Sequence, residues 1–470
     1  MSNNKKEELL ELEVDSIGFE GISIARKNDR VYFVRNGVPG DIVIAQVQKK
    51  HKNYTETQIK KFIKKSEFRT EVFCKYFGIC GGCSWQCLKY EEQLKWKKMH
   101  IIDAYKHIGK LENVFYYDTL AANKIRNYRN KMDFSFSANR WLTKEEIDSE
   151  LELDKTFALG LHIPNCYDKT LDVERCEIQN KEWNKILQSI RTKAKNIGVT
   201  AFNTYTKKGF LKGLCLRHSL KDNETMCILV TNSVEMKEDK IFLNWYNNEL
   251  KNISSNIVSI IHIINTRNTV NTGEIISIIG KEFITENILD IEFQISPFSF
   301  FQTNSYQLNN FIQLIIDTTE VKKNDIVWDL YCGTGSITLP ISKYCKQVYG
   351  IELIESAIYD AKKNAKLNNL TNTYFYTANL HNKKIPNLLN TLNRPDIIIL
   401  DPPRSGINRS LLEHLLTITP NKIVYVSCNP ATQARDLAIL KDKYNIVEVH
   451  SVDMFPHTYH IETITKLEKK

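Results

Sequence analysis

The sequence lacks the features that mark an exported or membrane-spanning chain. Its N-terminus, MSNNKKEELLELEV, has neither the apolar core nor the small-residue cleavage site of a signal peptide. The longest aliphatic stretch, at residues 257–264, is interrupted by Ser259 and His262 and is too short to span a bilayer. Internal repeats and low-complexity tracts are also missing. We therefore expect a cytoplasmic protein that does not contact membranes.

A disulfide framework is not expected either. The chain has 11 cysteines, an odd number, in 470 residues. In a long chain without an export signal, cysteines more often bind metals or act in catalysis. The length exceeds what one compact core requires, so two or three domains are predicted.

Acidic residues are slightly outnumbered. The chain has 64 Lys and Arg residues against 55 Asp and Glu residues, a net charge of +9. This excess is compatible with a polyanionic partner, but many basic enzymes never bind nucleic acid.

Three domains are predicted along the chain. Residues 1–65 contain five short alternating strands separated by turn residues, a pattern typical of an OB-like β-barrel. The end of this unit, KKHKNYTETQIKKFIKKS, is either a solvated edge or an RNA-facing rim of Lys and aromatic side chains. Residues 66–290 hold a cysteine cluster, a helical stretch and a mixed α+β region. Residues 291–470 alternate strands and helices, which predicts an α/β fold with a Rossmann-like, mostly parallel, doubly wound sheet.

A cofactor pocket is predicted in the third domain. In IVWDLYCGTGSIT, residues 326–338, a buried strand is followed by a glycine-rich turn and a helix expected to begin near Ser336. Glu352 ends the next strand, where a carboxylate can hold a ribose. The third glycine of a phosphate-binding turn is missing, and a later strand ends at Asp401-Pro402-Pro403. This combination favours S-adenosylmethionine over NAD.

A reactive cysteine is predicted beside this pocket. Cys428 ends the strand that follows the Asp401 strand, so both face one crevice. A thiolate there can add to carbon 6 of uracil, which makes carbon 5 nucleophilic. A base must later remove the carbon 5 proton. Glu462 is the predicted base, whereas His457 and His460 are expected to orient groups or contact RNA.

Three further cysteines have metal-ligand spacing. Cys74, Cys80 and Cys83 lie within FCKYFGICGGCSW, and a fourth ligand could be Cys87, Cys166 or Cys176. Zinc and a [4Fe–4S] cluster both accept four cysteines, and the spacing does not decide between them. The order of Cys80, Cys83 and Cys87 is the reverse of the radical Cys-x3-Cys-x2-Cys motif.

The chain resembles the RNA uracil-5-methyltransferases over most of its length. The resemblance is carried by the motifs FSFFQTNSYQ, DLYCGTGSI, GIELIESAI, DPPRSGI, VSCNPAT and MFPHTYHIE, in this order. It implies Cys428 as the nucleophile and Glu462 as the base. It also implies that the cofactor and the target base are surrounded by Gln302, Tyr331, Ser336, Glu352 and Asp401. Asn379 stands where relatives often have Asp, which puts its adenine contact in question.

Within this family, the chain is most similar to the subgroup that methylates 23S ribosomal RNA. That subgroup carries a TRAM domain, an OB-like barrel, and a [4Fe–4S] cluster. The similarity implies Cys74, Cys80, Cys83 and Cys176 as cluster ligands, S-adenosylmethionine as the methyl donor and 23S rRNA as the partner. The transfer-RNA members are expected to lack both modules. We expect a monomer.

Three other functions were weighed. A transfer-RNA uracil-5-methyltransferase is the nearest alternative. Amino-group methylation requires an aromatic residue after Asp-Pro-Pro, but Arg404 occupies that position and Cys428 would have no role. A non-catalytic RNA-binding or ribosome-assembly factor is disfavoured because the full set of Gln302, Glu352, Asp401, Cys428 and Glu462 is present.

Overall fold

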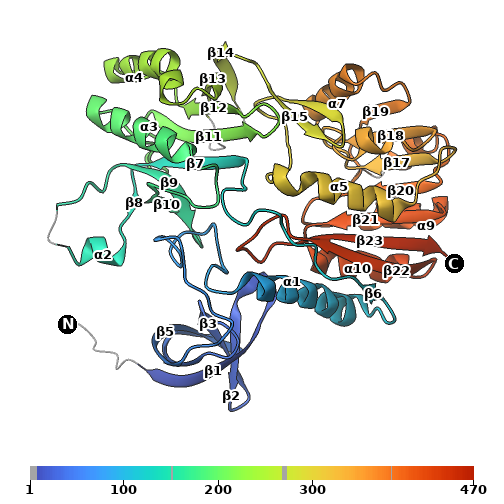
Figure 1. The fold of residues 1–470 in the computed structure, drawn as a ribbon, viewed down its shortest axis with the longest axis horizontal. Helices are drawn as coiled ribbons and strands as arrows, with labels where there is room; N and C mark the ends of the chain where they lie inside the picture. Colours follow the sequence, from blue (N-terminus) through green and yellow to red (C-terminus); the bar gives the residue numbers. More distant parts are fainter. Residues whose placement is uncertain (1–7, 150–151, 267–272, 383) are drawn as a thin grey trace.

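The structure is a computed structural model that describes residues 8–149, 152–266, 273–382 and 384–470. Residues 1–7, which begin the N-terminal segment without signal-peptide features, lie outside these ranges. Figure 1 shows three sheet-based parts: a blue barrel, a green central sheet and an orange-to-red C-terminal sheet. Within the described ranges, no helix is long and apolar enough to cross a membrane.

The N-terminal part is a closed five-stranded barrel, as the alternation predicted. Its strands, in the spatial order β1-β2-β3-β5-β4, are β1 (Leu9–Ile17), β2 (Ser23–Lys27), β3 (Arg30–Arg35), β4 (Ile42–Lys50) and β5 (Tyr54–Lys64). Alternate side chains such as Leu12, Val14 and Val43 point inward and form its small core. A 3₁₀ turn, Phe19–Gly21, connects β1 to β2.

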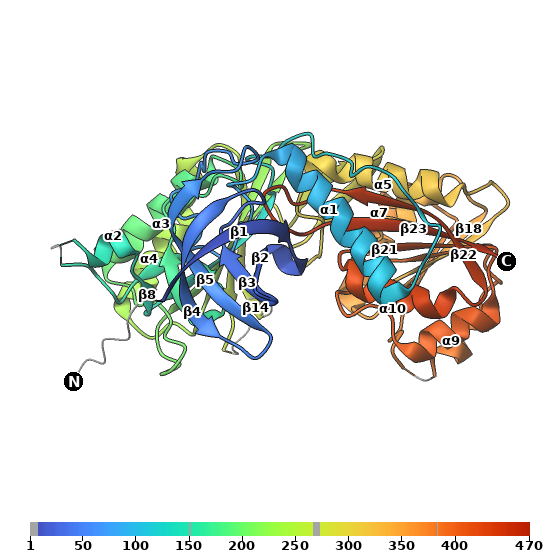
Figure 2. The same ribbon diagram turned by 90° about the horizontal axis from the view of Figure 1, so that it is seen from below.

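The segment after the barrel joins the three parts. Helix α1 (Tyr90–Ala104) continues into a π-helical turn, Tyr105–Gly109, and a short strand, β6 (Phe115–Tyr116), follows. Strand β6 pairs with the edge of the C-terminal sheet, and Ile101 and Tyr105 pack into the core under that sheet. His100 hydrogen-bonds the Ile17 carbonyl of the barrel at 2.9 Å. Figure 2 shows α1 running between the barrel and the C-terminal part.

The central part is a mixed sheet of eight strands in the order β14-β13-β12-β11-β7-β9-β10-β8. The strands are β7 (Lys131–Ser137), β8 (Arg140–Trp141), β9 (Ala158–Ile163), β10 (Cys166–Asp172), β11 (Leu211–Ser219), β12 (Glu224–Thr231), β13 (Ile257–Ile264) and β14 (Glu274–Gly280). The helices are α2 (Lys144–Ile147), α3 (Trp183–Ile197) and α4 (Lys237–Glu249), with a 3₁₀ turn at Leu250–Ile253. Apolar side chains of α3 and α4 cover one face of this sheet.

A hairpin connects the central and C-terminal parts. Strands β15 (Ile284–Ile288) and β16 (Ile291–Ile295) pair with each other and pack between the second face of the central sheet and helix α5 (Ser305–Thr319). The domain boundary placed at residue 290 therefore falls in the turn of this hairpin.

The C-terminal part is the expected α/β fold. Its sheet has the order β19-β18-β17-β20-β21-β23-β22-β6. The strands are β17 (Ile326–Leu330), β18 (Gln347–Glu352), β19 (Thr373–Thr377), β20 (Ile397–Leu400), β21 (Lys422–Ser427), β22 (Tyr444–Val452) and β23 (Glu462–Lys469). The helices are α6 (Thr338–Ile341), α7 (Glu355–Leu367), α8 (Ile385–Leu389), α9 (Arg409–Ile418) and α10 (Pro430–Leu440).

The strand order positions the candidate site. Strands β17 to β21 are parallel, and the chain order reverses between β17 and β20, where such sheets bind ligands. Strand β23 is antiparallel and lies between β21 and β22. The last strand of the chain therefore lies directly beside β21, the strand that Cys428 directly follows.

Candidate active site

The glycine-rich turn after β17 is held by Glu352. The Gly333 N–H donates to Glu352 Oε2 at 3.2 Å, and the Leu353 and Ile354 N–H groups donate to Oε1 at 2.7 and 3.0 Å. Gly335 has a φ of +86°, which a residue with a Cβ adopts only under strain. The helix after the turn begins at Thr338, slightly later than predicted, so Ser336 lies in the turn itself.

A group of carboxyl groups surrounds the switch point. Asp329 is fully buried, accepts a 2.5 Å hydrogen bond from Thr338 Oγ1, and has a pKa raised to about 7, mainly by burial. The negative charges of Asp401 and Glu352 add to this shift. Burial also raises the pKa of Asp401 to about 7. Crowded, poorly solvated carboxyl groups suit a cationic ligand, and S-adenosylmethionine carries a positive sulfonium.

The segment that contains Gln302 is anchored from two sides. Asn130 of the central part donates from Nδ2 to the Gln302 carbonyl at 3.0 Å and to Ser305 Oγ at 2.6 Å. Thr334 Oγ1, in the glycine-rich turn, donates to the Phe300 carbonyl at 3.3 Å. The backbone at Gln302 is thereby fixed beside the cofactor turn.

Tyr331 and Asn379 differ in what their side chains leave available. Tyr331 adopts a φ of +70°, and its buried hydroxyl has no hydrogen-bond partner within the described part of the chain. An unpaired buried hydroxyl indicates a place for a polar ligand atom. Asn379, by contrast, is exposed after β19, and its side-chain oxygen accepts from the His381 N–H at 2.8 Å.

Cys428 and Glu462 lie side by side at the ends of paired strands. In the antiparallel register Ser427, the last residue of β21, is paired with Thr463. Cys428, which follows β21, therefore lies opposite Glu462, the first residue of β23. Burial raises the pKa of the Cys428 thiol to about 11, with Glu462 and Asp401 adding to the shift and Arg404 opposing it. Glu462 is 5% exposed, and burial raises its pKa well above the usual range, with the charge of Asp401 adding.

Cys428 lines a cavity of about 70 Å³ that the barrel helps to close. Arg404 Nη2 donates to His460 Nδ1 at 2.7 Å on one wall. Burial lowers the His460 pKa to about 4, so this ring is neutral and can accept. Phe19 and Glu20, from the first barrel turn, line the same cavity. These two residues could not be predicted from the sequence, because nothing in a barrel turn indicates which other domain it contacts.

The predicted metal ligands line a separate cavity. Cys74, Cys80, Cys83 and Cys176 all face a space of about 160 Å³, together with Arg129 and Tyr76. Burial raises the pKa of Cys80 to about 11 and that of Cys83 to about 12. Among the described residues, no three His, Cys, Asp or Glu side chains converge closely enough to hold one metal ion.

The other two cysteines considered as fourth ligands lie elsewhere. Cys87 is buried with its thiol 3.9 Å from the Asn36 carbonyl of the barrel. Cys166 hydrogen-bonds Asp168 at 3.3 Å. The four cysteines named by resemblance share the cavity, and neither Cys87 nor Cys166 lines it. Cys166 packs nearby, against the same apolar cluster as Cys74, Cys80 and Cys176.

The comparisons with known proteins agree on one family. The family model described as tRNA (Uracil-5-)-methyltransferase matches residues 244–470. An uncharacterized RNA methyltransferase of Bacteroides thetaiotaomicron is 38% identical over 451 residues, 96% of this chain and 99% of that protein. A second one, from Chlorobaculum tepidum, is 39% identical over 437 residues, 92% of this chain and 90% of that protein.

A solved structure matches nearly the whole fold. The Pyrococcus abyssi tRNA (uracil-54, C5)-methyltransferase in complex with S-adenosyl-L-homocysteine is 27% identical, with a TM-score of 0.74 over 97% of this chain and 100% of that one. A match this complete includes the barrel and the cysteine segment. An enzyme named for transfer RNA therefore also has a barrel, contrary to expectation, and the presence of the barrel does not identify the RNA.

Proposed function

We propose that Cys428 and Glu462 carry out the chemistry of this chain, which belongs to the RNA uracil-5-methyltransferase family. The family membership makes the chain an S-adenosylmethionine-dependent methyltransferase acting on carbon 5 of uracil in RNA. The observation that carries the residue assignment is the register of β21 and β23, which sets the thiol beside a buried carboxyl group. A nucleophile and a base at one strand end are what methylation of this carbon requires.

The chemistry of the two residues follows in order. The Cys428 thiolate adds to carbon 6 of the uracil, and the electrons of the carbon 5–carbon 6 double bond move toward the carbonyl. Carbon 5 is then nucleophilic and takes up the methyl group. Glu462 removes the remaining carbon 5 proton, the double bond re-forms, and the thiolate leaves carbon 6 with its electron pair.

The cofactor residues are proposed from the crevice. S-adenosylmethionine, when bound, supplies an electrophilic methyl group. In this proposal Glu352 holds the ribose, and Asp401, Gln302, Tyr331 and Ser336 contact the rest of the cofactor or the target base. Asn379 is offered only as a weak adenine contact, because its oxygen is already used in its own turn.

We also propose that the four-cysteine cavity holds a [4Fe–4S] cluster. A single zinc ion would draw four sulfurs to one point at about 2.3 Å each. Here four partly buried thiols instead line a space of about 160 Å³, and no set of three in the described chain converges on one ion. Four thiolates match the four irons of a closed cluster, which would leave no iron open.

Two RNA classes are candidate substrates. The resemblance to the ribosomal subgroup implies 23S rRNA. The match to the Pyrococcus abyssi enzyme, whose printed name specifies transfer RNA, favours a tRNA uridine. The roles proposed for Cys428 and Glu462 are the same for either RNA.

One experiment tests the chemistry and another identifies the RNA. RNA containing 5-fluorouridine has no removable proton at carbon 5, so a covalent adduct that resists denaturation is expected with the wild-type protein and not with Cys428→Ala. Mapping of 5-methyluridine in 23S rRNA and tRNA from cells with and without the gene identifies the substrate. Loss of the mark from neither RNA would refute both candidates.

A further inference from the structure

Helix α1 binds the loop that leads to Glu462 through side-chain hydrogen bonds. This loop, residues 453–461, connects β22 to β23 and has no regular hydrogen bonding of its own. Asp453 follows Val452 directly, and Val452 is the cross-strand partner of Glu462. A shift of Asp453 therefore displaces the position of the proposed base.

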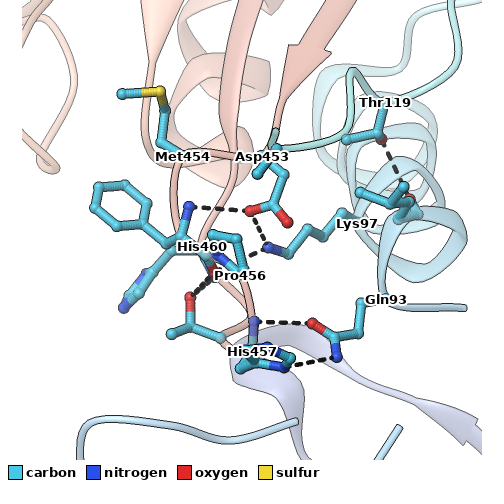
Figure 3. Close-up of polar contacts among 12 residues, drawn as sticks. Gln93, Lys97, Thr119, Asp453, Met454, Pro456, His457 and His460 are labelled. Carbon is cyan, nitrogen blue, oxygen red and sulfur yellow. Dashed lines mark hydrogen bonds and ion pairs between the residues drawn. The ribbon is translucent and has the colours of Figure 1, made fainter. Parts of the chain in front are cut away.

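The contacts between α1 and this loop include a fully buried ion pair, which Figure 3 shows. The Lys97 ammonium donates to Asp453 Oδ1 at 2.6 Å, and both side chains are 0% exposed. The Tyr90 hydroxyl donates to Asp453 Oδ2 at 2.9 Å. The Lys97 ammonium also donates to the Phe455 carbonyl at 3.2 Å.

One turn earlier on the same helix, Gln93 holds His457. The His457 N–H donates to Gln93 Oε1 at 2.9 Å, and Gln93 Nε2 lies 3.2 Å from His457 Nδ1 (Figure 3). Gln93 Nε2 also donates to the carbonyls of Trp85 and Leu88. His457 has a φ of +66°, a conformation that a side chain other than glycine adopts only when its surroundings impose it.

Four consecutive carbonyls of the loop are bound from outside it. Their donors, from residue 454 to residue 457, are Asn304 Nδ2, Lys97 Nζ, Tyr128 Oη, and the N–H groups of Ser84 and Trp85. Ser84 and Trp85 directly follow Cys83, so the cysteine segment also hydrogen-bonds the loop. These contacts restrain the backbone of residues 454–457.

We propose that Lys97 and Gln93 are positioning residues that hold Glu462 in register with Cys428. A buried ion pair adds little net stability, because desolvating both charges offsets their attraction, but it fixes geometry. Misplacing a catalytic group by about 1 Å can cost about 100-fold in rate. Because Glu462 acts after methyl transfer, the effect belongs to release of the RNA and not to formation of the adduct.

The test separates these two steps and rests on the proposed function. The main variant, Lys97→Met/Asp453→Asn, removes both charges and leaves no unpaired buried ion. Single-turnover reactions with S-adenosylmethionine and total RNA from cells lacking the gene measure the covalent adduct and its decay. We expect adduct formation within about threefold of wild type, decay about 100-fold slower, and cofactor affinity within about twofold.

Two further variants keep the test decisive. Tyr90→Phe keeps the ion pair but removes the hydrogen bond to Asp453, together with the one that the Tyr90 hydroxyl accepts from the Ala122 N–H. It should slow the same step by several-fold, even if the double variant does not fold. Lys98→Met, on the next residue of α1, removes a surface pair with the exposed Asp118 and should change nothing. Unchanged decay in a folded double variant, or equal slowing of both steps, would overturn the proposal. A wild-type protein that forms no adduct would instead refute the proposed function, and with it the positioning role of Lys97 and Gln93.

Discussion

The charge of Arg404 should control the reactivity of Cys428. The thiol has a pKa raised to about 11, so at pH 7 about one molecule in ten thousand carries a thiolate. Arg404 is the cation that opposes this shift, and it sits in the Asp-Pro-Pro-Arg turn, largely exposed to solvent. Replacing it with Met removes a charge that favours the thiolate, so the pKa should rise and reactivity should fall.

The expected size of this effect is modest because water screens Arg404. A solvent-exposed charge contact contributes at most about 1 kcal/mol. At about 1.36 kcal/mol per pKa unit, this raises the thiol pKa by about 0.7 units and lowers the thiolate fraction about fivefold. Arg404→Lys keeps the charge and should lie between wild type and Arg404→Met.

The assay needs no RNA. The rate of Cys428 alkylation by iodoacetamide, followed by mass spectrometry of the peptide that contains it, is measured between pH 7 and pH 11. The wild-type rate should rise about tenfold per pH unit with no plateau below pH 10, since only the thiolate reacts. The reasoning is refuted by a plateau near pH 9 in the wild type, or by faster alkylation in Arg404→Met. Methylation should likewise accelerate from pH 7 to pH 9, because the Cys428 thiol must be deprotonated.

Three further outcomes are expected. Cys428→Ala should abolish methyl transfer and leave cofactor affinity, measured by calorimetry, nearly unchanged; substantial turnover in this variant would remove the covalent mechanism. Glu462→Gln should form the methylated adduct but release RNA about 10²–10⁴-fold more slowly, and a complete block of adduct formation would show that Glu462 acts earlier. Protein purified anaerobically should be brown with about four irons per chain. The iron should be lost when Ser replaces any one of the cavity cysteines Cys74, Cys80, Cys83 and Cys176, whereas Cys87→Ser should keep it. Stoichiometric zinc would contradict the proposed [4Fe–4S] cluster.

The elements with strong periodicity could be predicted from the sequence. The barrel strands alternate buried and exposed side chains, and the parallel strands of the C-terminal sheet are apolar runs with Asp329, Glu352 and Asp401 at or next to their carboxyl ends. Residues at the ends of such strands meet at one edge, so the cofactor crevice could be located without coordinates. The exact start of helix α6 could not be predicted, because a turn of tight glycines delays it to Thr338.

Contacts between distant segments could not be predicted. The sequence alone determined which residues have the chemistry of a nucleophile, a base and thiol ligands, because residue type and spacing specify these properties. Only the tertiary structure decided that β23 inserts beside β21, that Phe19 reaches the Cys428 cavity, and that Lys97 is paired with Asp453. Local sequence carries propensity and periodicity, whereas these pairings depend on how separate apolar faces pack together, and each side of such a contact has an ordinary local pattern.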